Sequence, residues 1–126
     1  MLDARLSEGQ AETFLPLQSR PLGRLMAFME DPALTLVDRP AGLRKIIRLT
    51  GGSFIGPRIR AEILPGGGDW ALFRGDGVLT LDVRLTLRTD DGALVYMTYT
   101  GYRHATADVA ERLARGEEVA PSEMYY

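Results

Sequence analysis

The sequence of 126 residues has no cysteine, one histidine and one lysine. Without cysteine, disulfides and thiolate metal sites are excluded. A single histidine leaves only carboxylates as further metal ligands, and these show no spaced cluster, so we expect no metal and no cofactor.

Excess positive charge and long apolar runs are also missing. The net charge is −2 and the sequence pI is about 5.4, whereas a general nucleic-acid binder is usually basic, so we expect no nucleic-acid partner. No apolar run approaches the roughly 18 residues that span a bilayer, which argues against a membrane partner. The start of the sequence lacks the features of a signal peptide, so a cytoplasmic location is expected.

The length suits one domain with a substantial core. Pro16 and Pro21 interrupt the first part of the chain, which predicts an N-terminal arm over residues 1–21 and a single domain over residues 22–126. Within that domain, apolar and polar residues alternate with period two, which is typical of strands. Strands are predicted over residues 22–29, 33–37, 43–50, 53–64, 69–74, 78–88 and 93–103.

Glycines mark the expected breaks between these strands. Gly51-Gly52 is expected to end one strand, and Gly56-Pro57 to mark a bulge or an edge position within the next. Pro65-Gly66-Gly67-Gly68 predicts a tight turn that lets the backbone pass close to another group, such as a ligand. A phosphate loop is disfavoured there, because a strand follows where a helix would be needed.

Asp90-Asp91-Gly92 predicts the turn of a hairpin. A three-residue loop would place Arg84 opposite Thr98 and gather the polar residues of both strands on one face. A two-residue turn would instead bring Tyr99 and Arg103 towards Arg84 and Thr80. Turn length fixes the register, and the sequence leaves both alternatives open.

A short helix is predicted over residues 106–116, with Thr106 as N-cap and Gly116 as C-terminal stop. Many alternating strands with one helix, and no repeated strand-helix unit, predict a mainly β fold. The expected architecture is an antiparallel β-barrel, closed or nearly closed, with one short helix.

The sequence also resembles a known family in several blocks: residues 51–57, 64–70, 76–77, 81–84, 89–94 and 101–104. These blocks, above all the glycine-Asp-Trp run at residues 66–70, resemble the DUF3237 (UPF0311) family over about residues 25–126. The resemblance implies a β-barrel of the kind shared with allene oxide cyclase-like proteins, and no settled activity. Family members usually continue past Tyr126 for some tens of residues with further strands. Either the end is truncated here, or the barrel stays open and another subunit covers the exposed edge. An uncovered sheet edge would invite another chain, so a homo-oligomer is expected.

Asp69 is the first candidate for chemistry. A carboxylate beside the ring of Trp70 can have its pKa raised and act as an acid or base. The alternative is that Asp69 caps its own turn and Trp70 fills the core. His104 would also suit acid-base catalysis near neutral pH, although a lone loop histidine is usually solvated.

The candidate substrate-binding residues are Trp70, Arg84, Tyr96, Tyr99 and Arg103. Arginine can grip an anionic substrate with its planar fork, and tyrosine hydroxyls can hold a carbonyl or oxyanion. The alternative is that Arg84 forms a surface ion pair with Asp82, and the choice depends on which face of the hairpin is covered.

Two function classes remain from the sequence. The first is a cofactor-independent enzyme that acts by acid-base chemistry on a small carboxylate- or carbonyl-bearing compound, as an isomerase, cyclase, lyase or hydrolase. The second is a non-catalytic ligand-binding or oligomeric assembly module. Both predict a small-molecule ligand or a further copy of the chain as partner.

Overall fold

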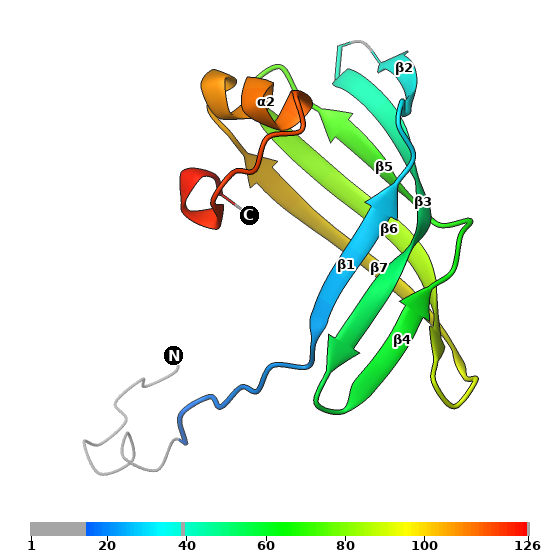
Figure 1. The fold of residues 1–126 in the computed structure, drawn as a ribbon. Coiled ribbons are helices and arrows are strands. Elements are labelled where there is room, and N and C mark those ends of the chain that lie inside the picture. The colour runs from blue at the N-terminus through cyan, green and yellow to red at the C-terminus, as the bar shows by residue number, and fades with distance from the viewer. Residues whose placement is uncertain (1–14, 39, 126) are drawn as a thin grey trace, which may run out of the picture.

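The computed structural model describes residues 15–38 and 40–125, which form one antiparallel sheet of seven strands followed by a helix (Figure 1). The helix α2 spans Ala107–Ala114, and a short 3-10 turn, η1, spans Pro121–Glu123. The strands are β1 (Arg24–Met29), β2 (Leu34–Asp38), β3 (Gly42–Gly56), β4 (Ile59–Ile63), β5 (Gly68–Phe73), β6 (Val78–Thr89) and β7 (Leu94–His104).

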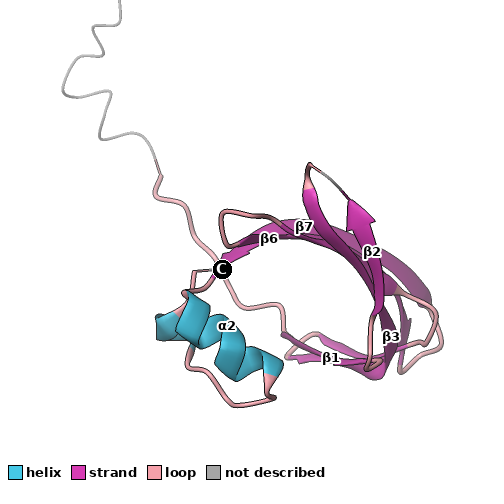
Figure 2. Ribbon diagram, turned by 90° about the horizontal axis from the view of Figure 1, so that it is seen from above, coloured by secondary structure: helices cyan, strands magenta, loops and turns pink. Residues whose placement is uncertain are grey.

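The strand pairings close on themselves around β3. This long strand pairs with β4 and β5, both of which pair with β6, so β3, β4, β6 and β5 form a closed circuit. β1 and β2 extend the sheet from β3, and β7 extends it from β6. Seen from above, the strands follow an arc and α2 lies at its open side (Figure 2). The predicted antiparallel, nearly closed barrel with one short helix is confirmed in the described part of the chain.

One face of this sheet carries the hydrophobic core, and we call it the core face; the opposite one is the outer face. Alternate residues of β6 supply its centre, because Val83, Leu85 and Leu87 are each at most 3% exposed. Residues directly opposite one another in neighbouring strands share a face, so the register assigns each side chain to one side. The buried cluster consists of Leu49, Phe54, Ala61, Ile63, Val83, Leu85 and Leu87.

The prediction that Gly51-Gly52 ends a strand is wrong, because β3 continues through both glycines. Leu49 and Phe54 both face the core although five residues separate them, so the chain changes alternation between them. Gly52 has φ +134°, and a Cβ on it would lie 2.1 Å from the Met26 carbonyl oxygen of β1. The glycine pair therefore lets β1 pack against β3 at the point where β3 switches faces.

The continuous strand predicted through Gly56-Pro57, with a bulge or an edge position there, is also wrong, since Gly56 ends β3 and Pro57 lies in the turn before β4. Gly56 lies opposite Ile59 in the resulting hairpin. A Cβ on Gly56 would meet the Leu22 carbonyl oxygen at 1.8 Å, so the glycine is needed for the close approach of the segment before β1.

The β6–β7 hairpin has the register of a three-residue loop. Arg84 lies opposite Thr98, and Thr86 lies opposite Tyr96. Of the two predicted alternatives, the three-residue loop over residues 90–92 is therefore confirmed. Its consequence is that Tyr99, opposite the buried Val83, turns to the core face while Arg84 turns to the outer face.

α2 begins at the predicted cap, where the Thr106 hydroxyl accepts a hydrogen bond from the Val109 N–H. Val109 is the buried residue of the helix. Beyond α2 the chain returns to the end of β7, where His104 and Tyr125 exchange two backbone hydrogen bonds of 3.0 and 2.9 Å. Arg112 also binds Glu123 of η1 at 2.7 Å, so helix and return segment hold each other.

Residues 15–21 of the predicted arm have neither helix nor strand and are exposed, and its residues 1–14 lie outside the described part. Among the residues that the structure describes, no helix has the length and apolar character needed to cross a membrane.

Candidate functional site

Asp69 is the buried acidic residue of the described core, with 7% of its surface exposed. It lies on β5 between Ile47 of β3 and Val83 of β6, so its side chain belongs to the core face. Its Oδ1 accepts a hydrogen bond of 2.9 Å from the backbone N–H of Asp82. The alternative that Asp69 only caps its own turn is therefore not what the structure shows, since the bond crosses to another strand.

This bond stands where the β5–β6 ladder is interrupted. The paired register runs from Asp69 opposite Val83 to Leu72 opposite Thr80 and skips the two positions between them. The carbonyl of Trp70, within the gap, accepts instead from the Arg44 guanidinium at 2.8 Å. Two side chains thus satisfy backbone groups that the ladder leaves open.

Burial is the main influence on the Asp69 carboxyl, and it raises the pKa because the charged form loses hydration. The Asp82 N–H acts in the opposite direction, the negative charge of Asp82 raises the pKa further, and the positive charge of Arg103 lowers it. In the described residues no fully buried side-chain oxygen lacks a hydrogen-bond partner. The Asp82 N–H engages Oδ1, and 7% of the surface of Asp69 remains exposed.

The predicted site residues divide between the two faces of the sheet. Asp69, Tyr99 and Arg103 occupy the core face, Arg103 lying opposite the buried Leu79. The outer face carries Trp70, Arg84 and Tyr96, with the Arg84 guanidinium 5.1 Å from the centre of the Trp70 ring. Arg84 also pairs with Asp82 at 3.6 Å, and both side chains are about half exposed. The surface alternative for Arg84 therefore holds, and these residues do not converge on one interior.

His104 stands apart from both groups. It is the last residue of β7, opposite Val78, and its side chain is exposed. A Cβ on Gly77 would approach its ring at 3.6 Å, so the turn before β6 lies beside it.

A cavity of about 720 Å³ lies on the core side, between the β1–β2 turn, β3, β5 and the end of α2. Lys45, Ile47 and Phe73 line its sheet wall, and Ile47 is the residue directly opposite Asp69. The Lys45 ammonium lies 4.9 Å from the centre of the Phe73 ring. Sequence reasoning did not select Lys45, although its alternation with Leu43 and Ile47 already placed it on the apolar side of β3.

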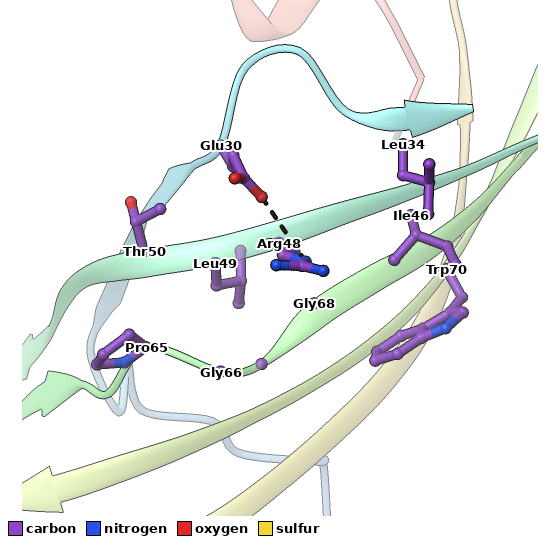
Figure 3. A pocket seen from close by; sticks show the side chains of 11 residues that line it. Glu30, Leu34, Ile46, Arg48, Leu49, Thr50, Pro65, Gly66, Gly68 and Trp70 are labelled. Atoms are coloured by element: carbon purple, nitrogen blue, oxygen red, sulfur yellow. Dashed lines mark ion pairs between the residues drawn. The ribbon is translucent and has the colours of Figure 1, made fainter.

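A second hollow, of about 560 Å³, lies on the outer face around Trp70 (Figure 3). Leu34, Ile46 and Trp70 form its apolar wall, and Glu30 and Arg48 form an ion pair of 3.7 Å at its edge. The glycine bend before β5 borders it. A Cβ on Gly67 would lie 2.5 Å from the Arg84 carbonyl oxygen, so the close approach of this backbone is to β6. In residues 15–38 and 40–125, no group of three or more histidine, aspartate or glutamate side chains could hold a metal ion.

Comparison with known proteins identifies relatives of this chain. The UPF0311 protein RPA1785 of Rhodopseudomonas palustris is 35% identical over 85 residues, which cover 68% of this chain and 56% of that protein. The UPF0311 protein CA_C3321 of Clostridium acetobutylicum is 33% identical over 98 residues, covering 78% and 62%. The family model described as "Protein of unknown function (DUF3237)" matches residues 18–126. The chain belongs to the DUF3237 family.

Solved structures agree with this DUF3237 assignment. The crystal structure of RPA1785 superposes with a TM-score of 0.74 at 29% identity, over 84% of this chain and 73% of that one. A beta-barrel like protein of Acinetobacter baumannii gives a TM-score of 0.62 at 35% identity, over 87% and 74%. The family predicted from sequence is thus confirmed. This DUF3237 chain spans little more than half the length of the first curated relative it matches.

Proposed function

We propose that this chain binds a small carboxylate- or carbonyl-bearing molecule on the core side of its sheet. In this proposal it acts on that molecule by acid-base chemistry without a cofactor, with Asp69 as the acid-base group. The observation that carries the proposal is a buried carboxyl whose pKa is raised and which is held through one oxygen, Oδ1, by a main-chain N–H.

The asymmetry of the two oxygens defines the chemistry. Oδ1 is engaged by the Asp82 N–H, so a proton added to Asp69 resides on Oδ2. A raised pKa moves the group towards neutral pH, where an acid can both give and take a proton at useful rates. Isomerases, cyclases, lyases and hydrolases that use such a transfer share this requirement.

The residues around Asp69 supply binding groups for the same molecule. Ile47 lines the cavity and lies directly opposite Asp69 on the neighbouring strand. Directly opposite residues are about 5 Å apart at Cβ, so Asp69 lies one strand away from the cavity wall. Lys45 and Arg103 provide positive charge for a carboxylate, and the Tyr99 hydroxyl provides a donor for a developing oxyanion.

Asp69→Asn tests the proposal with little change of shape, because the amide oxygen can still accept from the Asp82 N–H. Glu62→Gln is the charge control, since it removes a negative charge from an exposed residue of β4 that does not act on Asp69. Small carboxylic acids, ketones and lactones are screened by thermal shift and then by product analysis. Turnover of a hit by the native chain and the Glu62 variant, but not by the Asp69 variant, supports the proposal. Equal turnover by all three contradicts it.

An assembly function is the second candidate, and the edge of the sheet favours it. β7 has 11 residues and, in the described part of the chain, pairs with β6 along its length and otherwise only with Tyr125, at its last residue His104. Its side chains Leu94, Tyr96 and Tyr102 are at least 60% exposed. Free strand edges of this kind pair readily with another chain, so we infer a homo-oligomer joined through β7.

Light scattering after size exclusion tests this assembly. Tyr96→Lys places a charge on the β7 edge, which natural sheets use to prevent pairing, and should lower the oligomer mass. Leu17→Lys is the control, because Leu17 is 99% exposed and lies outside the sheet. A native monomer, or an unchanged mass for Tyr96→Lys, contradicts assembly through this strand.

A further inference from the structure

We infer that the outer hollow around Trp70 is a second ligand site, separate from the core side, for a small aromatic or otherwise apolar acid. Its volume of about 560 Å³ lies within the range of small-molecule pockets. The sheet itself separates it from Asp69: Trp70 lies opposite Ile46 on the outer face, whereas Asp69 lies opposite Ile47 on the core face.

The floor of the hollow is apolar and held in place. Leu34, Ile46 and Trp70 lie side by side in three neighbouring strands, since Leu34 is opposite Ile46 and Ile46 is opposite Trp70. The ring of Trp70 folds back over Gly68, where a Cβ would come within 3.3 Å of it. The Arg84 guanidinium lies 5.1 Å from the centre of the same ring. The indole therefore presents a fixed surface for a flat apolar ligand.

The glycine bend makes room beside that surface. Gly66 has φ +109° and nothing within 4 Å of the position of a Cβ, so the bend leaves open space above the hollow. The Gly66 N–H bonds the Leu49 carbonyl and the Leu49 N–H bonds the Gly67 carbonyl, which fixes the bend to β3. The open edge is thus part of the fold.

Arg48 supplies the charge that selects an acid. Its pairing with Glu30 spans 3.7 Å, longer than a hydrogen bond, and the two side chains are 71% and 50% exposed. Ion pairs of this kind contribute little to stability, so a ligand carboxylate that binds both arms of the guanidinium can displace Glu30. The Glu30 N–H bonds the Arg48 carbonyl at 2.8 Å and keeps both residues at the rim during such an exchange.

The test uses naphthoate as probe, with uncharged naphthamide as its matched analogue. Trp70 is the one tryptophan, so its indole N–H signal in a nitrogen-proton NMR spectrum reports on this hollow. The signal should shift saturably with naphthoate, and naphthamide should bind about tenfold more weakly, as loss of a charged hydrogen bond predicts.

Four variants decide where the probe binds and why. Arg48→Gln should weaken naphthoate binding about tenfold and leave naphthamide unchanged, whereas the exposed Arg58→Gln, which removes the same charge elsewhere, should change neither. Glu30→Gln removes the competing carboxylate and should strengthen naphthoate binding. Asp69→Asn should have no effect, because it alters only the core side.

Three results would overturn the inference. The first is the absence of a saturable Trp70 shift, and the second is equal binding by the Arg48 and Arg58 variants. The third is loss of naphthoate binding in Asp69→Asn with Arg48→Gln unaffected, which would place the probe on the core side. That third result would leave the proposed acid-base function standing, and failure of the Asp69 turnover experiment would leave this outer site standing.

Discussion

The carboxylate of Asp69 accepts a hydrogen bond of 2.9 Å from the backbone N–H of Asp82, in the gap where β5 and β6 lack paired positions. Asp69→Ala should therefore destabilise the fold by about 1–3 kcal/mol, because the N–H loses its acceptor. Asp69→Asn keeps an acceptor and should cost less. Urea unfolding of both variants measures the difference, and equal losses in the free energy of unfolding would show that the bond does not contribute to stability.

The raised pKa of Asp69 predicts how stability changes with pH. Between about 3.9, the ordinary value, and the higher pKa in the folded chain, the folded state binds more protons than the unfolded state. The contribution of Asp69 to stability therefore falls as pH rises through this window. Asp69→Asn lacks this titration. In thermal melts from about pH 3.5 to about pH 7, the Tm of the variant should therefore rise relative to that of the native chain as the pH increases. A constant difference, or one of opposite sign, contradicts the prediction.

Arg44 is expected to stabilise the same region from the other side of the gap. Its guanidinium donates to the Trp70 carbonyl at 2.8 Å. Arg44→Met keeps much of the stem but leaves this carbonyl without its donor, which should cost about 1 kcal/mol or more. Arg58→Met, an exposed arginine in the turn before β4, is the control and should stay within about 0.5 kcal/mol. Chemical denaturation compares the two, and similar values would contradict the role of Arg44.

Gly52 should be among the glycines that tolerate alanine least. Its φ is +134° and a Cβ would meet the Met26 carbonyl oxygen at 2.1 Å, so Gly52→Ala should cost more than about 2 kcal/mol through loss of β1 packing. Gly75 has open space around the same position, and Gly75→Ala should change stability by less than about 0.5 kcal/mol. Thermal or urea unfolding distinguishes them, and a tolerant Gly52 would mean that β1 is easily displaced.

Much of the fold could be predicted because its strands alternate cleanly. In β6 the apolar set that includes Val83 and Leu85 faces the core, as period two requires. The helix boundaries followed from Thr106 and Gly116 for equally local reasons. These features depend on neighbours in the chain, which a sequence displays directly.

The errors arose where distant segments decide the local conformation. Gly51-Gly52 has the composition of a turn, yet it continues β3 because β1 approaches it closely, and that contact is invisible in the sequence. The site was incomplete for a similar reason. Arg84 and Tyr99 fall on opposite faces only once the hairpin register is known, and the ladder gap beside Asp69 depends on three strands at once.

The two backbone bonds between His104 and Tyr125 fix both ends of the C-terminal segment at the same place on the sheet. Residues 105–124 leave the end of β7 and return to it, so they form a long loop that begins and ends at one point of the sheet. Lengthening such a loop costs little, since closure entropy grows only logarithmically. The helix could therefore be exchanged for a foreign peptide of another size while the strands kept their pairing, which makes this position a natural place for grafting.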